Sequence, residues 1–148
     1  MDLRKLVRLF YQLKIVNQET TSRFEKEVGF SLTRYELLMS LKENGKCLQN
    51  QLQENLKIDF AAISRHLKLL EEKGYVMRER NSQNNREVFV SLSKKAVQEI
   101  THCEREFQEA DTALNIGLSD EETEQLSNLL SKLLIKKEDI DGTSSSNE

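Results

Sequence analysis

One stretch, residues 48–92, restricts the possible folds of this chain more than any other. Apolar residues at 48, 52 and 56 keep a spacing of four, which places them on one face of a short helix. After a brief break, a second apolar set recurs at helical spacing until Gly74: Phe60, Ile63, Leu67 and Leu70. Asp59 precedes this set, where its side chain can accept hydrogen bonds from the first free N–H groups. Two helices joined by so short a turn predict a helix-turn-helix.

Two strands and a turn are expected after the second helix. Residues 75–80 and 86–92 have the alternating pattern of strands, with Val88, Val90 and Leu92 sharing one face. The polar residues 81–85 between them include three Asn, which tolerate the left-handed conformations of a tight turn. The segment predicts a hairpin with three arginines along its flanks, namely Arg78, Arg80 and Arg86.

The polar side of the second helix has the composition of a surface that reads DNA bases. Ala61, Ala62 and Ser64 are small enough to allow close approach to a major groove. Arg65 can donate two parallel hydrogen bonds to the O6 and N7 acceptors of guanine. The alternative is an amphipathic helix whose polar face is only solvated, which is common for a helix considered alone. The cationic hairpin favours nucleic acid, because arginine at a projecting tip is attracted to a minor groove and to phosphates.

Charge is distributed unevenly along the 148 residues, a length that suits one domain of ordinary size. The formal net charge is −3, which argues against a protein that coats DNA nonspecifically. Residues 56–95 contain nine Lys or Arg and five Asp or Glu, whereas residues 96–148 contain four and thirteen. This partition suits a protein that contacts phosphate with one part only.

Amphipathic helices are expected on both sides of this stretch. Apolar residues recur at spacings of three and four in the N-terminal segment, and Ser93 can cap a helix with a stripe that includes Cys103 and Phe107. Ser119 and Glu122 form a capping box for a final helix, and Thr33 and Glu36 predict another that opens a helix over 34–43. Because one winged helix does not need so many extra helices, we expect their stripes to meet a second copy rather than to pad a monomer core. The predicted dimerisation residues are Leu3, Leu6, Phe10, Phe107, Leu126, Leu130 and Leu133.

Several segments together resemble the MarR (multiple antibiotic resistance regulator) family of winged-helix transcription factors. They are residues 32–38 (LTRYELL), the helix pair, residues 70–78 (LEEKGYVMR) and residues 84–93 (NNREVFVSLS). The resemblance covers nearly the whole chain and implies a mainly α (α+β) fold, a winged helix-turn-helix with N- and C-terminal dimerisation helices. One departure is Asn84, which stands where the family wing usually carries a bracing Asp, while Arg86 is retained. Asn can accept a hydrogen bond but cannot form an ion pair, so a less rigid wing is expected.

The resemblance implies a domain plan and a function. Residues 31–95 are expected to form the DNA-binding domain, 1–30 and 96–138 a helical dimerisation domain, and 139–148 a disordered polar tail. We expect a homodimeric transcriptional regulator, a repressor released by a small-molecule ligand. It would bind a pseudo-palindromic operator in double-stranded DNA through the 59–73 helix and the 81–87 wing. The predicted DNA-binding residues are Gln49, Asn50, Gln51, Ala61, Ala62, Ser64, Arg65, His66, Lys68, Arg78, Arg80, Asn84, Asn85 and Arg86.

An effector site is a further implication of the resemblance. It would lie between the winged domain and the dimerisation helices and take a small phenolic or lipophilic ligand. Two other readings remain open at this point. The chain could be a protein-interaction adaptor, which its acidic C-terminal portion would suit, or a regulator that senses oxidants through Cys47 or Cys103.

The sequence contains no constellation typical of an enzyme. His102 and Cys103 are adjacent on a predicted helix, about 100° apart, which is poor geometry for holding one metal ion. No phosphate-binding glycine loop and no nucleophile elbow occur. We therefore expect no catalysis, no metal and no cofactor. Charged residues interrupt the apolar N-terminal segment and no run approaches the roughly 20 apolar residues of a membrane span, so a cytoplasmic location without membrane contact is expected.

Overall fold

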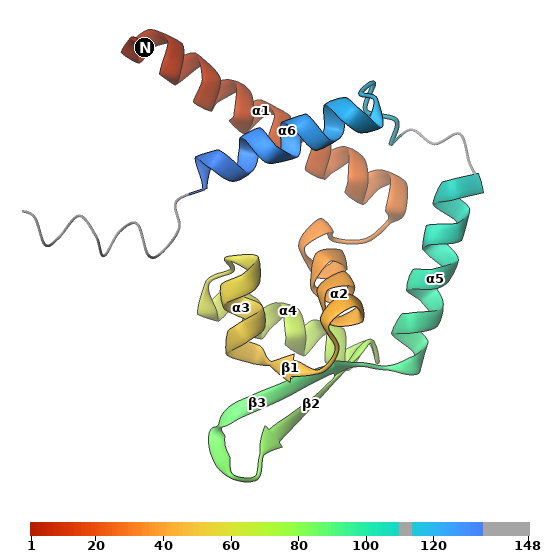
Figure 1. Ribbon diagram of the computed structural model, residues 1–148. Coiled ribbons are helices and arrows are strands. Elements are labelled where there is room, and N and C mark those ends of the chain that lie inside the picture. The colour runs from red at the N-terminus through yellow and green to blue at the C-terminus, as the bar shows by residue number, and fades with distance from the viewer. Residues whose placement is uncertain (110–113, 135–148) are drawn as a thin grey trace, which may run out of the picture. The chain divides into compact units, whose positions relative to one another are not determined.

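The computed structural model describes residues 1–109 and 114–134 of the chain (Figure 1). Two compact units are distinguished, Met1–Leu114 and Asn115–Glu148. The elements of the first unit are α1 (Leu3–Val28), α2 (Leu32–Asn44), β1 (Cys47–Leu48), α3 (Gln49–Leu56), α4 (Phe60–Glu72), β2 (Val76–Asn81), β3 (Asn84–Leu92) and α5 (Lys94–Glu109). The described part of the second unit contains α6 (Asp120–Leu133). The predicted tail at 139–148 lies outside the described residues.

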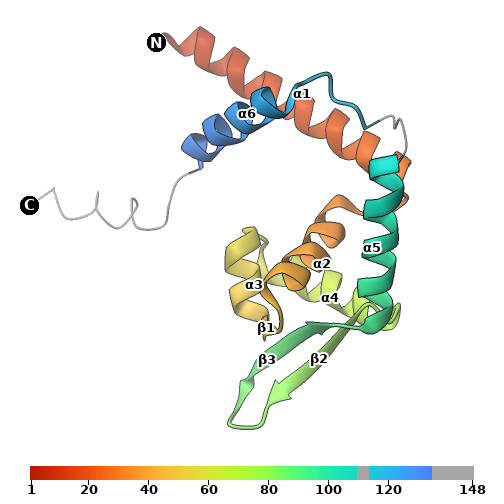
Figure 2. The ribbon, with the colours of Figure 1, turned by 45° about the vertical axis from the view of Figure 1, so that its right-hand side comes forward.

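The three strands form one antiparallel sheet in the order β1-β3-β2. Strands β2 and β3 pair from Val76 opposite Leu92 to Arg80 opposite Val88, which confirms the predicted hairpin. Figure 2 shows this hairpin, the wing, extending beyond the helices α2, α3 and α4. The sequence did not predict β1: Leu48, which was expected in a helix, pairs with Phe89 instead. A strand of two residues is too short to show an alternating pattern. Its hydrogen bonds come from a segment that is distant in the sequence.

The predicted caps of three helices are confirmed. The side chain of Asp59 accepts a hydrogen bond from the Ala62 N–H of α4 at 3.0 Å. The Ser93 hydroxyl accepts one from the Ala96 N–H of α5 at 3.1 Å and donates one to the Gly74 carbonyl at 2.6 Å. Gly74 has a φ of 79°, a conformation that glycine adopts without strain. The box formed by Ser119 and Glu122 opens α6. One hydroxyl, that of Ser93, thus joins the end of the α4 segment to the start of α5.

The predicted capping box at Thr33 and Glu36 is wrong. Helix α2 begins at Leu32, and Ser31 is its cap, since the Ser31 hydroxyl accepts a hydrogen bond from the Arg34 N–H at 3.3 Å. Two hydroxyl residues close together in sequence offer alternative starting points for a helix. The neighbouring Phe30 packs against the core, and this packing favours the earlier start.

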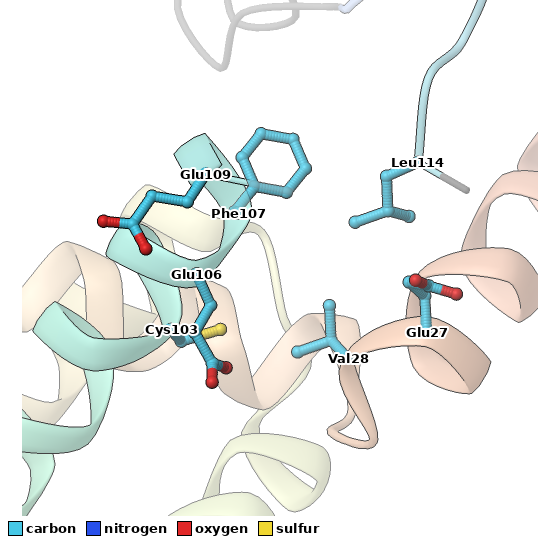
Figure 3. A pocket seen from close by; sticks show the side chains of 7 residues that line it. All are labelled: Glu27, Val28, Cys103, Glu106, Phe107, Glu109 and Leu114. Atoms are coloured by element: carbon cyan, nitrogen blue, oxygen red, sulfur yellow. The ribbon is translucent and has the colours of Figure 1, made fainter. Parts of the chain in front are cut away.

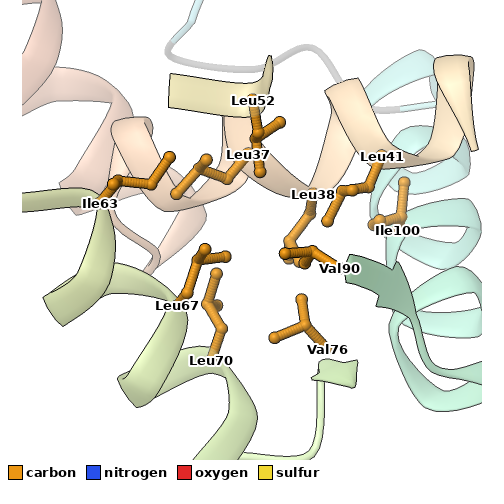
Figure 4. Packing of buried hydrophobic residues seen from close by; sticks show 10 residues of the cluster. All are labelled: Leu37, Leu38, Leu41, Leu52, Ile63, Leu67, Leu70, Val76, Val90 and Ile100. Carbon is orange, nitrogen blue, oxygen red and sulfur yellow. The ribbon is translucent and has the colours of Figure 1, made fainter. Parts of the chain in front are cut away.

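A hydrophobic core lies beneath α4 and fixes its orientation (Figure 4). Residues from α2, α3, α4, α5 and two strands form it: Leu37, Leu38, Leu41, Leu52, Ile63, Leu67, Leu70, Val76, Val90 and Ile100. Because Ile63, Leu67 and Leu70 are all buried, α4 cannot rotate about its axis without exposing apolar surface. The side of α4 opposite these three residues therefore always faces solvent.

As far as the described residues show, neither α1 nor α6 contains a buried residue. On α1, Leu3 and Phe10 are exposed and Leu6 is half-buried. On α6, Leu126, Leu130 and Leu133 are exposed. Phe107 near the end of α5 is exposed as well. The residues predicted to mediate dimerisation are thus largely left uncovered by the part of the chain that the structure describes.

Candidate nucleic-acid interface

The solvent side of α4 presents Ala61, Arg65 and Lys68, all exposed. At about 100° per residue these three lie within roughly 60° of one another around the helix. Within residues 1–109 and 114–134, the side chains of Arg65 and Lys68 make no hydrogen bond or ion pair. Their charges are therefore available to a partner with phosphates and acceptor atoms.

The start of α3 is joined to α4 through side chains that were predicted to bind DNA. The Gln49 amide donates a hydrogen bond to the Ser64 hydroxyl at 3.3 Å, so these two residues are brought together. The Gln51 side-chain oxygen accepts from the Leu48 N–H at 3.1 Å, and that of Asn50 accepts from the Gln51 N–H at 2.9 Å. Both oxygens stabilise the helix start, which leaves the amide N–H groups of Asn50 and Gln51, both exposed, free to donate to a phosphate.

The wing arginines have different surroundings. Arg78 forms a two-point ion pair with Glu71 of α4, with Nη2–Oε1 at 3.1 Å and Nε–Oε2 at 3.3 Å. Arg80 donates to the Asn85 carbonyl at 3.4 Å. Arg86 is exposed, and its side chain has no polar partner among the residues that the structure describes. The predicted row of three cations is therefore reduced to one unengaged guanidinium, because Arg78 holds the wing against α4 and Arg80 braces the tip.

Amide side chains stabilise the wing turn. The Asn84 oxygen accepts a hydrogen bond from the Arg86 N–H at 3.2 Å. Asn81 accepts from the Gln83 N–H at 3.0 Å and donates to the Glu87 carboxylate at 3.3 Å. Asn84 and Asn85 are both exposed. Hydrogen bonds of amide side chains thus hold the turn, where an acidic residue at position 84 would allow an ion pair.

His66 and Ala62 are half-buried on another side of α4. Burial, and after it the charges of Arg34 and Arg65, lower the pKa of His66, while Asp59 opposes this effect. The neutral imidazole is favoured there, as expected beside two cations. Arg34 of α2 is a cation near this side that the sequence did not single out, since one arginine at a helix start has no distinctive pattern.

Two cavities lie between the end of α1 and α5. One of about 460 Å³ is lined by Glu27, Val28, Cys103, Glu106, Phe107, Glu109 and Leu114 (Figure 3). The other, of about 130 Å³, shares Val28 and Cys103 with it and is also lined by the rings of Phe30, Tyr35 and Tyr75. Tyr35 packs edge-on against Phe24 and Phe30, with ring centroids 5.6 and 6.2 Å apart. Tyr35 therefore supports the interior of this unit.

The two tyrosines of the smaller cavity are protonated at neutral pH. Burial, with a further contribution from the Cys103 thiol, raises the pKa of Tyr35. A hydrogen bond with Glu99, and then burial, raises the pKa of Tyr75. A protonated phenol can both donate and accept a hydrogen bond, so the cavity offers polar contacts beside its aromatic surface.

Neither a metal centre nor a membrane span is found in the described residues. No three His, Cys, Asp or Glu side chains within residues 1–109 and 114–134 are grouped to hold a metal ion. In the same part of the chain, no helix combines the length and the apolar character that crossing a bilayer demands.

Two helices joined by a short turn, with unpaired cations on the second and a β-hairpin beside it, define a winged helix-turn-helix protein. Residues 30–88 match the MarR family. The uncharacterized HTH-type transcriptional regulator YdgJ of Bacillus subtilis is 34% identical over 125 residues, 84% of this chain and 76% of that protein. The chain belongs to the MarR family.

Solved structures agree with this fold. A mutant MarR from E. coli in complex with operator DNA has a TM-score of 0.76 and 24% identity, covering 91% of this chain and all of that one. BpsR of Bordetella bronchiseptica, whose DNA binding is regulated by 6-hydroxynicotinic acid, has a TM-score of 0.69 and 17% identity over 85% of this chain and 98% of that one.

These matches confirm the predicted winged-helix fold. The chain is a MarR-type transcriptional regulator that binds DNA. Members of the family are transcription regulators, so the prediction that the chain is not an enzyme is confirmed too.

Proposed function

We propose that this chain is a homodimeric repressor that acts in the cytoplasm and binds a pseudo-palindromic operator. Each subunit would place α4 in a major groove and Arg86 of its wing in the adjoining minor groove. The observation that carries this proposal is the pair of unengaged cations, Arg65 and Lys68, on the side of α4 opposite the core. The related E. coli protein complexed with operator DNA supports it.

The surroundings of each residue indicate its role at such an interface. Arg65 would read guanine, and Ala61 would allow the helix to approach the bases. Lys68 and the amide groups of Asn50 and Gln51 would contact phosphates, which positions the protein without selecting a sequence. Ser64 is tied to Gln49, so we expect it to act with that amide rather than alone.

Selection of bound fragments from random DNA tests this function. A palindromic consensus with two half-sites about one helical turn apart is expected, because two related α4 helices would enter successive major grooves. Affinity for the selected site should fall steeply as salt rises, since cationic contacts release counterions from phosphate. No enriched sequence and no salt dependence would contradict the proposal and leave the protein-interaction adaptor as the better reading.

The exposed apolar residues of α1 and α6 support dimerisation. We expect the variant Leu130→Glu to sediment as a monomer of 17.2 kDa, and the unaltered chain as twice that mass, because a buried carboxylate would oppose association. Operator affinity should fall as well, since the reading helices of two subunits are no longer linked. Analytical ultracentrifugation and a binding titration measure the two effects.

Asn128→Glu is the matched control for this variant. It adds the same charge to α6 about 160° around the helix from Leu130. The control should remain a dimer and retain operator binding. A dimeric Leu130→Glu protein would show that α6 lies outside the subunit interface.

The cavities between α1 and α5 are the best candidates for an effector site. Their surfaces combine the rings of Phe30, Tyr35 and Tyr75 with four carboxylates, those of Glu27, Glu99, Glu106 and Glu109. We infer that a small lipophilic or phenolic ligand binds there in a neutral form, because carboxylates at the larger cavity repel an anion. Such a ligand would release DNA only if it prefers a spacing of the two reading helices that the operator does not allow.

Thermal unfolding in the presence of matched small ligands tests this site. We expect neutral 4-ethylphenol to raise the unfolding temperature and the anion 4-ethylbenzoate to have little effect, since only a bound ligand stabilises the native state. Tyr35→Phe removes one phenol from the smaller cavity and should reduce the shift. Equal shifts by both compounds would contradict the charge argument.

The cysteines favour the ligand model over a thiol sensor. Burial raises the pKa of Cys47, which lowers the fraction of reactive thiolate at neutral pH. Cys103 is half-buried and lines both cavities, where it forms part of the wall. Operator affinity should therefore be the same before and after mild peroxide treatment.

A further inference from the structure

Phe60, the first residue of α4, is the most exposed large apolar residue of the winged helix-turn-helix. Its exposed fraction is 70%, against 55% for Met77 and 38% for Leu32, the other exposed large apolar residues within 31–95. Its sequence spacing relative to Ile63, Leu67 and Leu70 places it in the apolar set of this helix. Those three residues are fully buried and Phe60 is not.

The position of Phe60 in the helix explains this exposure. Side chains of an α-helix lean towards the N-terminus and cover the preceding turn. Phe60 has no preceding turn, because Asp59 is the cap in an extended conformation. The ring therefore has no helical turn to cover and stays exposed, while Ile63 and Leu67, one and two turns later, fill the core.

The chemistry of this end of α4 suits one kind of chemical group on DNA. The N-terminal residues of a recognition helix are the ones that contact base edges in the major groove. Phe60 lies one turn before Ser64 and next to Ala61, while the cations Arg65 and Lys68 come later in the helix. The Asp59 carboxylate accepts the Ala62 N–H at this end, so that donor is not free for a phosphate. The apolar group that the major groove offers is the 5-methyl group of thymine.

We propose that Phe60 is a specificity-determining residue that recognises the 5-methyl group of a thymine in each half-site of the operator. This inference rests on the proposed function, because it requires α4 to lie in the major groove. Contact with the ring would shield both apolar groups from water, which favours T·A over the other base pairs at that position.

Replacement of thymine by deoxyuridine in the selected operator tests this contact at the level of one methyl group. Deoxyuridine pairs with adenine as thymine does and lacks only the 5-methyl group. We expect the unaltered protein to bind about fourfold more weakly for each contacted methyl that is removed, and roughly fifteenfold more weakly when both half-sites are changed. Phe60→Ala should bind the thymine operator more weakly and no longer distinguish it from the deoxyuridine operator.

Three further variants show whether the effect belongs to Phe60. Met77→Ala removes another exposed apolar side chain and should preserve the full preference for thymine. Arg65→Ala should weaken binding and also preserve that preference, because it loses a guanine contact instead. Phe60→Leu, which retains apolar surface, should preserve part of it.

The outcomes separate this inference from the proposed function. An unaltered protein that binds the selected operator but tolerates deoxyuridine at every position would overturn the role of Phe60 and leave the function intact. A preference for thymine that survives in Phe60→Ala would also overturn it and assign the methyl contact to another residue. A chain that selects no operator would overturn both proposals.

Discussion

The variant Arg65→Ala is expected to bind the operator more weakly by roughly 1–3 kcal/mol and to have relaxed specificity at one base pair of each half-site. Arg65 is exposed on α4 and, within the described residues, engages no acidic side chain. Its guanidinium can therefore donate two hydrogen bonds to guanine without first breaking an ion pair. Titration against the consensus and against single-base variants measures both effects.

Lys68→Ala is the matched comparison for Arg65. It removes a cation one turn along the same exposed side, and it should weaken binding to all sequences similarly. It should also reduce the salt dependence of binding by about one phosphate contact. Unchanged affinity and base preference in Arg65→Ala would contradict the orientation of α4 proposed above.

The second large effect concerns stability: Leu67→Ala is expected to lower the free energy of unfolding by roughly 2–5 kcal/mol. Leu67 has no exposed surface, and neighbours from α2, α3 and the strands surround it in the core (Figure 4). Alanine would leave a cavity that this rigid packing cannot fill. Because natural domains are stable by only about 5–15 kcal/mol, the loss would be a large part of the total.

Urea unfolding at fixed protein concentration measures this loss, since the stability of a dimer depends on concentration. Leu69→Ala is the control, because Leu69 is the same residue type on the same helix but only half-buried. Its loss should be clearly smaller. Equal losses of unfolding free energy for the two variants would show that burial in the core does not set the contribution of Leu67.

Local signals in the sequence were enough to predict most of the winged helix. The caps Asp59 and Ser93 are recognised from residue type and from the apolar pattern that follows each of them. The wing hairpin follows from alternation and an Asn-rich turn. Each of these features depends on residues close together in the chain, so a pattern can reveal them.

Features that depend on distant residues could not be predicted. The pairing of Leu48 with Phe89 joins segments about forty positions apart and has no periodicity to reveal it. The ion pair between Arg78 and Glu71 also depends on the folded chain, because the path of the chain around Gly74 brings β2 against α4. A count of arginines near the wing therefore overstates the number that are free to meet DNA.

The sequence by itself determined the order of the elements, the family resemblance and the small, hydroxylic and cationic composition of α4. Only the tertiary structure decided which of those side chains are available. Arg65, Lys68 and Arg86 remain unengaged among the described residues, Arg78 and Arg80 brace the wing, and Phe60 is exposed in spite of its apolar spacing. The physical reason is that local pattern sets which face of a helix is buried, whereas the exposure and pairing of one side chain depend on the neighbours that the folded chain brings to it.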